Sequence, residues 1–127
     1  MYVVDASAVL AVLLGEDGRE NVEPHLPGAE MSIVNLCEVL TTTVEKGGEP
    51  EVAERVIASY GVRIRAFREA HAMEAAKLRP VTKAFGLGLG DRVCLAQGLL
   101  SDRPILTADR DWALVDLGPG FDIRLIR

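Results

Sequence analysis

The first seven residues constrain the fold more than any other segment of this chain. A short apolar run from Tyr2 to Val4 ends abruptly in the carboxylate of Asp5, and a helical pattern begins at once with Ala6. Continuous apolar residues of β-forming type indicate a strand buried on both faces, as in a parallel sheet. Asp5 would then lie at the carboxyl end of that strand, where open α/β sheets bind their ligands. The position also suits an N-cap of the following helix, so the segment alone supports both interpretations.

The remaining chain alternates between short apolar runs and helical patterns. Further strands are predicted at residues 29–31, 62–66, 104–106 and 121–126. Helices are predicted at 6–15, 33–46, 50–60, 68–77 and 92–100, with a short helix in 16–26, a loop or broken helix over 82–90 and one turn at 111–114. This alternation, without repeat or linker, predicts an α/β fold: a parallel sheet of about five strands with helices on both faces.

The helix predicted after Ser32, which is a good N-cap, carries two neighbouring stripes of unlike character. Its polar stripe consists of Asn35, Glu38 and Thr42. Its apolar stripe has helical spacing and is expected to face the core. The apolar residues are Ile33, Leu36, Cys37, Leu40 and Val44.

Charge is distributed unevenly along the chain. The net charge of −5 by itself argues against a nucleic-acid partner. Residues 63–92, however, hold seven basic residues against three acidic ones, a net charge of +4, which leaves −9 for the rest. A solvated basic face and a surface that guides an RNA backbone both fit this bias. The candidates for RNA-backbone contacts are Arg65, Arg68 and Lys83.

The cysteines, histidines and apolar segments indicate a cytoplasmic protein without a membrane partner. We expect Cys37 and Cys94 to be buried free thiols in a reducing compartment. His25 and His71 are expected at the surface, since neither has a ligand-type residue three or four positions away. No stretch reaches the roughly 20 apolar residues of a membrane span, and no basic region precedes the apolar N-terminus.

Four acids occupy comparable places in this predicted fold. Asp5 and Asp109 each follow a short apolar strand, Asp91 begins a helix after a glycine-rich run, and Glu38 lies beside a core-facing stripe. If the strands before Asp5 and Asp109 are adjacent and parallel, both side chains project from one edge of the sheet. Two hydroxyls are near in sequence and are candidates to orient a carboxylate or a water, Ser7 and Thr107.

Clustered carboxylates are tolerated near neutral pH when cations neutralise them. Oxygen ligands without a His or Cys array favour hard ions, which here means Mg²⁺, with Mn²⁺ as a substitute. Carboxylate-held Mg²⁺ commonly serves the hydrolysis of phosphodiesters. Each acid also has a plain structural interpretation, as a helix cap, a surface residue, a first-turn residue or a turn residue.

Four segments, in order along the chain, resemble the motifs of the PIN domain, most closely as found in VapC toxins of bacterial and archaeal toxin–antitoxin pairs. They are Val-Val-Asp5-Ala-Ser7-Ala, Ser32-Ile-Val-Asn35-Leu-Cys-Glu38-Val, Leu-Gly-Asp91-Arg-Val-Cys-Leu-Ala and Leu-Thr107-Ala-Asp109-Arg-Asp111-Trp. Each motif alone is weak, but the ordered set is specific. The resemblance covers the whole chain, as a single PIN-like domain over residues 1–127.

The resemblance implies a Mg²⁺-dependent endoribonuclease, a homodimer that a VapB antitoxin silences. It implies that the catalytic acids are Asp5, Glu38, Asp91 and Asp109, with Asp5 and Asp91 as the most direct metal ligands. Supporting positions would be Ser7, Asn35, Thr107 and Asp111.

Other classes of protein are alternatives to this interpretation. A phosphate-handling fold of the haloacid dehalogenase type needs a second Asp where Ser7 stands, and a response-regulator receiver needs an acidic pair where Ala6 follows Asp5. A P-loop is absent, because no Gly-Lys-Ser/Thr follows the glycines at 86, 88 and 90. A non-catalytic RNA-binding or interaction module stays open, and metal-dependent nuclease activity would separate it from the favoured interpretation.

Overall fold

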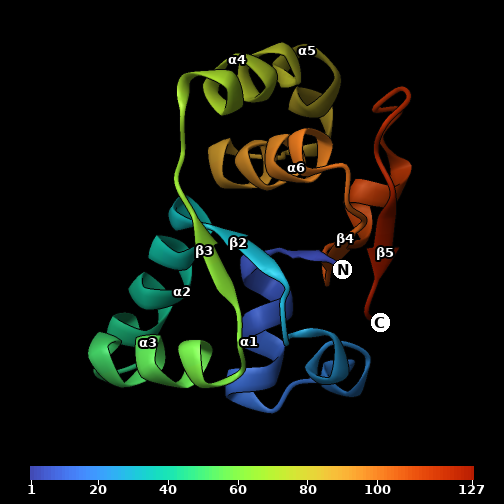
Figure 1. Ribbon diagram of the computed structural model, residues 1–127. Coiled ribbons are helices and arrows are strands. Elements are labelled where there is room, and N and C mark those ends of the chain that lie inside the picture. The colour runs from blue at the N-terminus through green and yellow to red at the C-terminus, as the bar shows by residue number, and fades with distance from the viewer.

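The computed structural model describes residues 1–127, whose strands form one five-stranded sheet with every neighbouring pair parallel. Along the sheet the strand order is β3-β2-β1-β4-β5, which places β1 in the centre (Figure 1). The predicted parallel α/β architecture is therefore confirmed. The strands are β1 (Val3–Val4), β2 (Glu30–Ser32), β3 (Arg63–Arg65), β4 (Ile105–Thr107) and β5 (Ile123–Leu125).

Helices cover both faces of the sheet (Figure 1). One face carries α1 (Ala6–Leu14), α2 (Ile33–Glu45) and α3 (Pro50–Ser59). The other carries α4 (Glu69–Lys77), α5 (Arg79–Thr82) and α6 (Leu89–Ser101). None of these helices is both long and apolar enough to cross a membrane.

Successive residues of a strand pack into different cores, because side chains alternate between the two faces of a sheet. Val4 and Leu106 pack into the larger core with residues of α1, α2 and α3. Val3 and Ile105 pack into the other core, with Leu95 of α6 and other residues. Both faces of the central strands are thus buried, as the unbroken apolar run before Asp5 predicts.

The boundaries of two predicted elements were wrong. The short helix expected in 16–26 is a pair of 3₁₀ turns, η1 (Arg19–Asn21) and η2 (Glu23–His25). The helix expected at 92–100 begins three residues earlier, at Leu89, with Gly88 as its N-cap in extended conformation. Two further 3₁₀ turns are η3 (Lys83–Phe85) and η4 (Arg110–Leu114).

The orientation of α2 also differs from the prediction. Ser32 does cap the helix, since its Oγ accepts a hydrogen bond from the Val34 N–H at 3.2 Å. The residues that α2 buries are Asn35, Leu36 and Val39, whereas Ile33, Cys37 and Val44 of the predicted apolar stripe are exposed. The prediction that Cys37 is buried was therefore wrong, while Cys94 is buried as expected.

Candidate active site

Asp5 lies at the carboxyl end of β1 and is only 4% exposed. Its side chain does not cap α1, although Asp5 occupies the N-cap position. Instead Oδ2 accepts hydrogen bonds from Ser7 Oγ at 2.6 Å and from Thr107 Oγ1 at 3.0 Å. The capping interpretation of Asp5 is excluded, and the carboxylate is held in place by the two hydroxyls that the sequence singled out.

These hydroxyls connect the carboxyl ends of β1 and β4, which are neighbouring parallel strands. Ser7 Oγ accepts a hydrogen bond from the Ala108 N–H at 2.9 Å, and Thr107 Oγ1 accepts one from the Asp109 N–H at 3.1 Å. The two hydroxyl oxygens lie 3.3 Å apart. The position of Asp5 is therefore coupled directly to the backbone that carries Asp109.

A second set of contacts connects α2 to the beginning of α6. Asn35, which is fully buried, donates from Nδ2 to Glu38 Oε1 at 2.8 Å and to the Gly90 carbonyl at 2.9 Å. The backbone of Gly90 lies so close to the Glu38 carboxylate that a Cβ at position 90 would overlap it. Glycine is therefore required by a close approach at position 90, whereas a Cβ at Gly88 would meet open space.

Asp91 and Asp109 both have the local structural roles considered for them. Asp91 Oδ2 accepts a hydrogen bond from the Gly88 N–H at 2.9 Å, in the first turn of α6. Asp109 Oδ1 accepts one from the Asp111 N–H at 3.0 Å and thereby caps η4. Asp111 itself is exposed.

The four acids influence one another electrostatically. Burial raises the pKa of Asp5 to about 6, hydrogen bonds from Ser7 and Thr107 oppose that rise, and the charges of Asp91 and Glu38 add to it. The pKa of Asp91 is raised by burial and by the charges of Glu38 and Asp109, against the hydrogen bond from Gly88. Like charges thus gather at one edge of the sheet.

No lysine or arginine forms an ion pair with these acids. The carboxylates that do form ion pairs are Glu16, Glu30, Glu74 and Asp122. Asn35 Oδ1 is buried without a hydrogen-bond partner. No group of three His, Cys, Asp or Glu side chains is placed to hold an ion. Mg²⁺ usually keeps several waters and takes only one or two protein carboxylates together with substrate phosphates, so this oxygen-only set fits it.

The other residues singled out from the sequence lie away from this acidic site or have different roles. Arg65 forms an ion pair with Glu30, with Nε 3.7 Å from Oε2, while Arg68 and Lys83 are exposed and lack ion pairs. His25 is exposed, and His71 Nδ1 accepts a hydrogen bond from the Arg68 N–H. Leu89, exposed beside Glu38, could not be predicted, because nothing in its local sequence marks it as exposed.

Together these features define a parallel α/β protein with an acidic, oxygen-only site at the carboxyl ends of its central strands. The family model described as "PIN domain" matches residues 2–117. The chain belongs to the PIN domain family.

Curated and solved relatives agree with this assignment. Ribonuclease VapC42 of Mycobacterium tuberculosis is 28% identical, over 92% of this chain and 97% of that protein. A toxin–antitoxin complex from Klebsiella pneumoniae has a chain with a TM-score of 0.74 and 17% identity, covering 95% of both chains. VapBC2 from Rickettsia felis, solved bound to a DNA fragment from its promoter, has a chain that also gives a TM-score of 0.74. It is 14% identical, and the match covers 98% of this chain and 97% of that chain. At these identities the solved structures support the fold.

Proposed function

We propose that this protein is a Mg²⁺-dependent endoribonuclease of the VapC type, acting as a single domain over residues 1–127. It is the toxin of a type II toxin–antitoxin pair and is inhibited by a VapB-like antitoxin. One observation carries the proposal: a buried carboxylate, Asp5, is held by Ser7 and Thr107 within electrostatic reach of other acids that have no ion-pair partner. The naming of its relatives as VapC ribonucleases supports the same activity.

Asp5 and Asp91 are the residues that would hold the metal. Bound there, Mg²⁺ would supply activation of a water and stabilisation of the negative charge that develops on the phosphate and the leaving oxygen. Around it the protein supplies orientation. Ser7 and Thr107 fix Asp5, and Asn35 fixes Glu38 through Oε1, which leaves Glu38 Oε2 free to accept a proton from the attacking water.

The decisive experiment compares RNA cleavage by the purified protein in Mg²⁺, in Mn²⁺ and in excess chelator. Cleavage is expected only with metal, and Asp5→Asn should reduce it at least about a hundredfold, because a metal-bound charge is removed. Asp17→Asn is the matched control, because the Asp17 side chain is exposed. Its backbone carbonyl, which accepts a hydrogen bond from Arg127, is kept in the variant. Undiminished cleavage in chelator would refute the metal mechanism.

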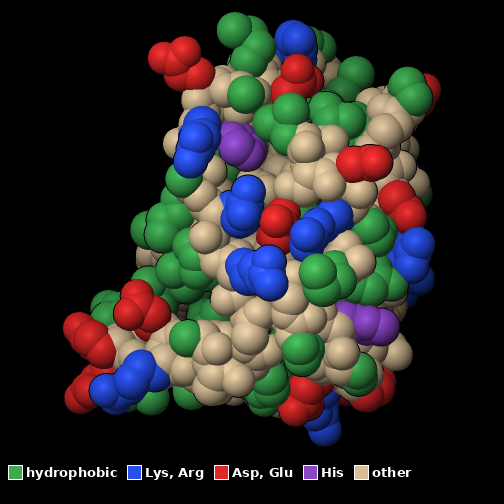
Figure 2. Space-filling model, viewed as in Figure 1, with side chains coloured by type: hydrophobic (Ala, Val, Ile, Leu, Met, Phe, Trp, Pro, Cys, Tyr) green, Lys and Arg blue, Asp and Glu red, His purple; other side chains and the backbone are tan.

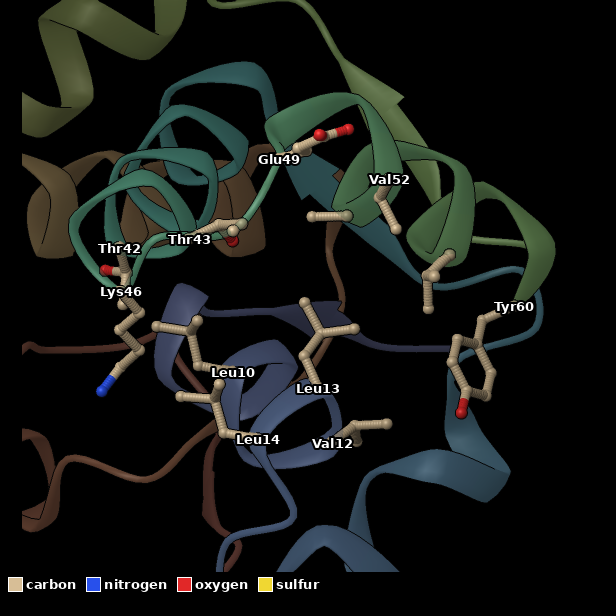
Figure 3. A pocket seen from close by; sticks show the side chains of 13 residues that line it. Leu10, Val12, Leu13, Leu14, Thr42, Thr43, Lys46, Glu49, Val52 and Tyr60 are labelled. Atoms are coloured by element: carbon tan, nitrogen blue, oxygen red, sulfur yellow. The ribbon is translucent and has the colours of Figure 1, made fainter.

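Inhibition by an antitoxin is supported by an apolar groove between α1 and α3, with Thr42 and Thr43 of α2 at one side (Figure 3). The groove has a volume of about 490 Å³, and leucines from α1 face valines from α3 across it. An amphipathic helix buries its apolar face in a groove of this kind. A basic side chain of the same antitoxin would compete for the carboxylates by pairing with them. Solved VapBC complexes of similar fold support this assembly.

The partner is tested by co-expression with the product of any small reading frame found beside this gene, and the expected homodimer is tested with the toxin alone. A stable complex is expected, and Val52→Glu, placed in the groove, should abolish it, whereas Leu114→Glu on the exposed η4 should not. Sedimentation of the toxin alone should give a dimer at micromolar concentration. A monomer would refute the dimer, and failure of the adjoining gene product to bind would refute the antitoxin.

A further inference from the structure

A second groove opens beside Glu38, between α2 and the first residues of α6. Its volume is about 440 Å³. Two of its lining residues, Glu38 and Gly90, belong to the acidic site, so the groove continues directly from that site. The full lining is Val34, Cys37, Glu38, Thr41, Thr42, Leu89 and Gly90.

The lining combines apolar side chains with two hydroxyls and the carboxylate of Glu38. Leu89 is 61% exposed, and Cys37 is exposed in the same groove. Thr41 donates its hydroxyl hydrogen to the Cys37 carbonyl at 2.7 Å, which leaves its oxygen lone pairs as acceptors. No lysine or arginine lines the groove.

We infer that this groove is a subsite for one nucleobase of the RNA, flanking the phosphodiester that is cut. The inference rests on the proposed ribonuclease function and adds to it a place where sequence preference arises. The RNA backbone does not suit the groove, because phosphates would meet Glu38 and no cation. A base suits it, since its faces are apolar and its edges carry hydrogen-bond donors.

A helix of an antitoxin is better accommodated elsewhere. The α1–α3 groove of Figure 3 is the larger of the two and has more hydrophobic residues in its lining. The groove beside Glu38 is bounded on one side by the beginning of α6, which supplies Leu89 and Gly90. Its few apolar side chains offer one planar ring a surface to pack against, whereas the more apolar α1–α3 groove suits the apolar face of a helix.

The exposed thiol of Cys37 gives a direct readout of occupancy. The Asp5→Asn variant, which should bind without cutting, is treated with N-ethylmaleimide in Mg²⁺ with and without single-stranded oligoribonucleotides, and adducts are quantified by mass spectrometry. RNA at ten times its Kd should slow alkylation of Cys37 about tenfold, because only the free fraction reacts. Buried Cys94 serves as the internal reference. A Cys37→Ala, Val44→Cys variant carries its thiol on the exposed face of α2 outside the groove and should show no protection.

Matched substitutions test the preference itself in the active protein. Leu89→Ala should raise KM about tenfold and change the nucleotide preferred beside the cut, because the base then has less apolar surface to pack against. Leu100→Ala, on the exposed face of the same helix, should change neither. Thr41→Val should also change the nucleotide preference. Thr43 is the matched control, because its hydroxyl donates to the Val39 carbonyl of the same helix but Thr43 lies outside this groove, so Thr43→Val should leave the nucleotide preference unchanged.

Protection of Cys37 by RNA together with altered preference in Leu89→Ala supports the subsite. Cleavage by the parent protein with an unprotected Cys37 and unchanged preference overturns the subsite while the proposed function stands. Protection by the antitoxin but not by RNA also overturns it and assigns the groove to protein binding. Protection by RNA without cleavage under any metal supports base binding in the groove but overturns the proposed nuclease and, with it, the place of the groove beside a cut.

Discussion

Asp5 is the residue at which burial and charge oppose each other most directly. Its pKa of about 6 lies above the value of 3.8 for an unperturbed Asp, so the folded chain holds a proton more tightly than the unfolded chain does. Stability therefore falls as the pH rises between these two values and stays reduced above them. The carboxylate is kept charged at neutral pH at a cost to the fold, as is common at functional sites.

This conflict predicts a specific pH dependence for the metal-free protein. In chelator, the free energy of unfolding contributed by Asp5 should fall by roughly 3 kcal/mol between about pH 4 and pH 6. Asp5→Asn should lack this fall and should therefore be the more stable protein at pH 7. Denaturant unfolding of both proteins across this range measures the difference, and parallel curves would show that burial does not perturb Asp5.

Gly90 gives the second prediction at the scale of single residues. In Gly90→Ala the new Cβ would displace the Glu38 carboxylate and its hydrogen bond from Asn35. Cleavage should fall about ten- to a hundredfold, because a small misplacement of a reacting group is costly. Thermal stability should change little, since the helix preference of alanine offsets the hydrogen bond that buried Asn35 loses. Gly88→Ala meets open space and is the control; equal losses of cleavage in both variants would contradict the role of the close approach at Gly90.

At the scale of elements, α2 packs one face into the core and leaves the adjoining face exposed. It buries Asn35 beside Leu36 and Val39, and the amide of Asn35 tolerates burial because its Nδ2 makes two hydrogen bonds. Its partners are α1, α3 and α6, and their positions decide which apolar residues of α2 face the core. The groove beside Glu38 is formed by the face that this orientation leaves exposed.

A pair of valines on α2 tests this orientation. Val39 is fully buried and Val44 is 56% exposed. Val39→Ala should lower the free energy of unfolding by roughly 2 kcal/mol, because it leaves a cavity in the core. Val44→Ala should change it by less than about 0.5 kcal/mol, as for most surface substitutions. The apolar stripe predicted from the sequence would require the larger loss at Val44, so urea unfolding of the two variants separates the two orientations.

At the scale of the whole molecule, part of the positive charge stabilises a buried carboxylate. Figure 2 shows basic side chains gathered over the middle of the sheet around an acidic one. Glu30, 5% exposed, forms ion pairs with Arg65 and Arg103 and accepts a hydrogen bond from Ser101. Burial works to raise the pKa of Glu30, but the Ser101 hydrogen bond and the Arg103 charge hold it below its usual value. Arg65 is thus partly committed to the fold.

The basic residues that form no ion pair, Arg68 and Lys83, predict how RNA binding depends on salt. Arg68→Gln together with Lys83→Gln should weaken binding and reduce the slope of log K against log salt by about 2, one for each phosphate that the variant no longer binds. Arg55→Gln together with Lys46→Gln removes the same charge from outside residues 63–92 and should leave the slope unchanged. Equal slopes in the two double variants would make residues 63–92 an ordinary solvated face.

Local patterns of apolar, polar and turn-forming residues were enough to predict the alternation of strands and helices, the burial of β1 and four candidate acids. They placed Asp5 and Asp109 at one edge on the condition that the two preceding strands are adjacent and parallel, which the pairing of β1 with β4 meets. Local patterns could not predict that Ser7 and Thr107 both bond to Asp5, that Asn35 joins Glu38 to Gly90, or that Cys37 and Leu89 are exposed. These features depend on contacts between residues far apart in the chain and on the rotation of α2, which its packing against three other helices sets and its own periodicity leaves open.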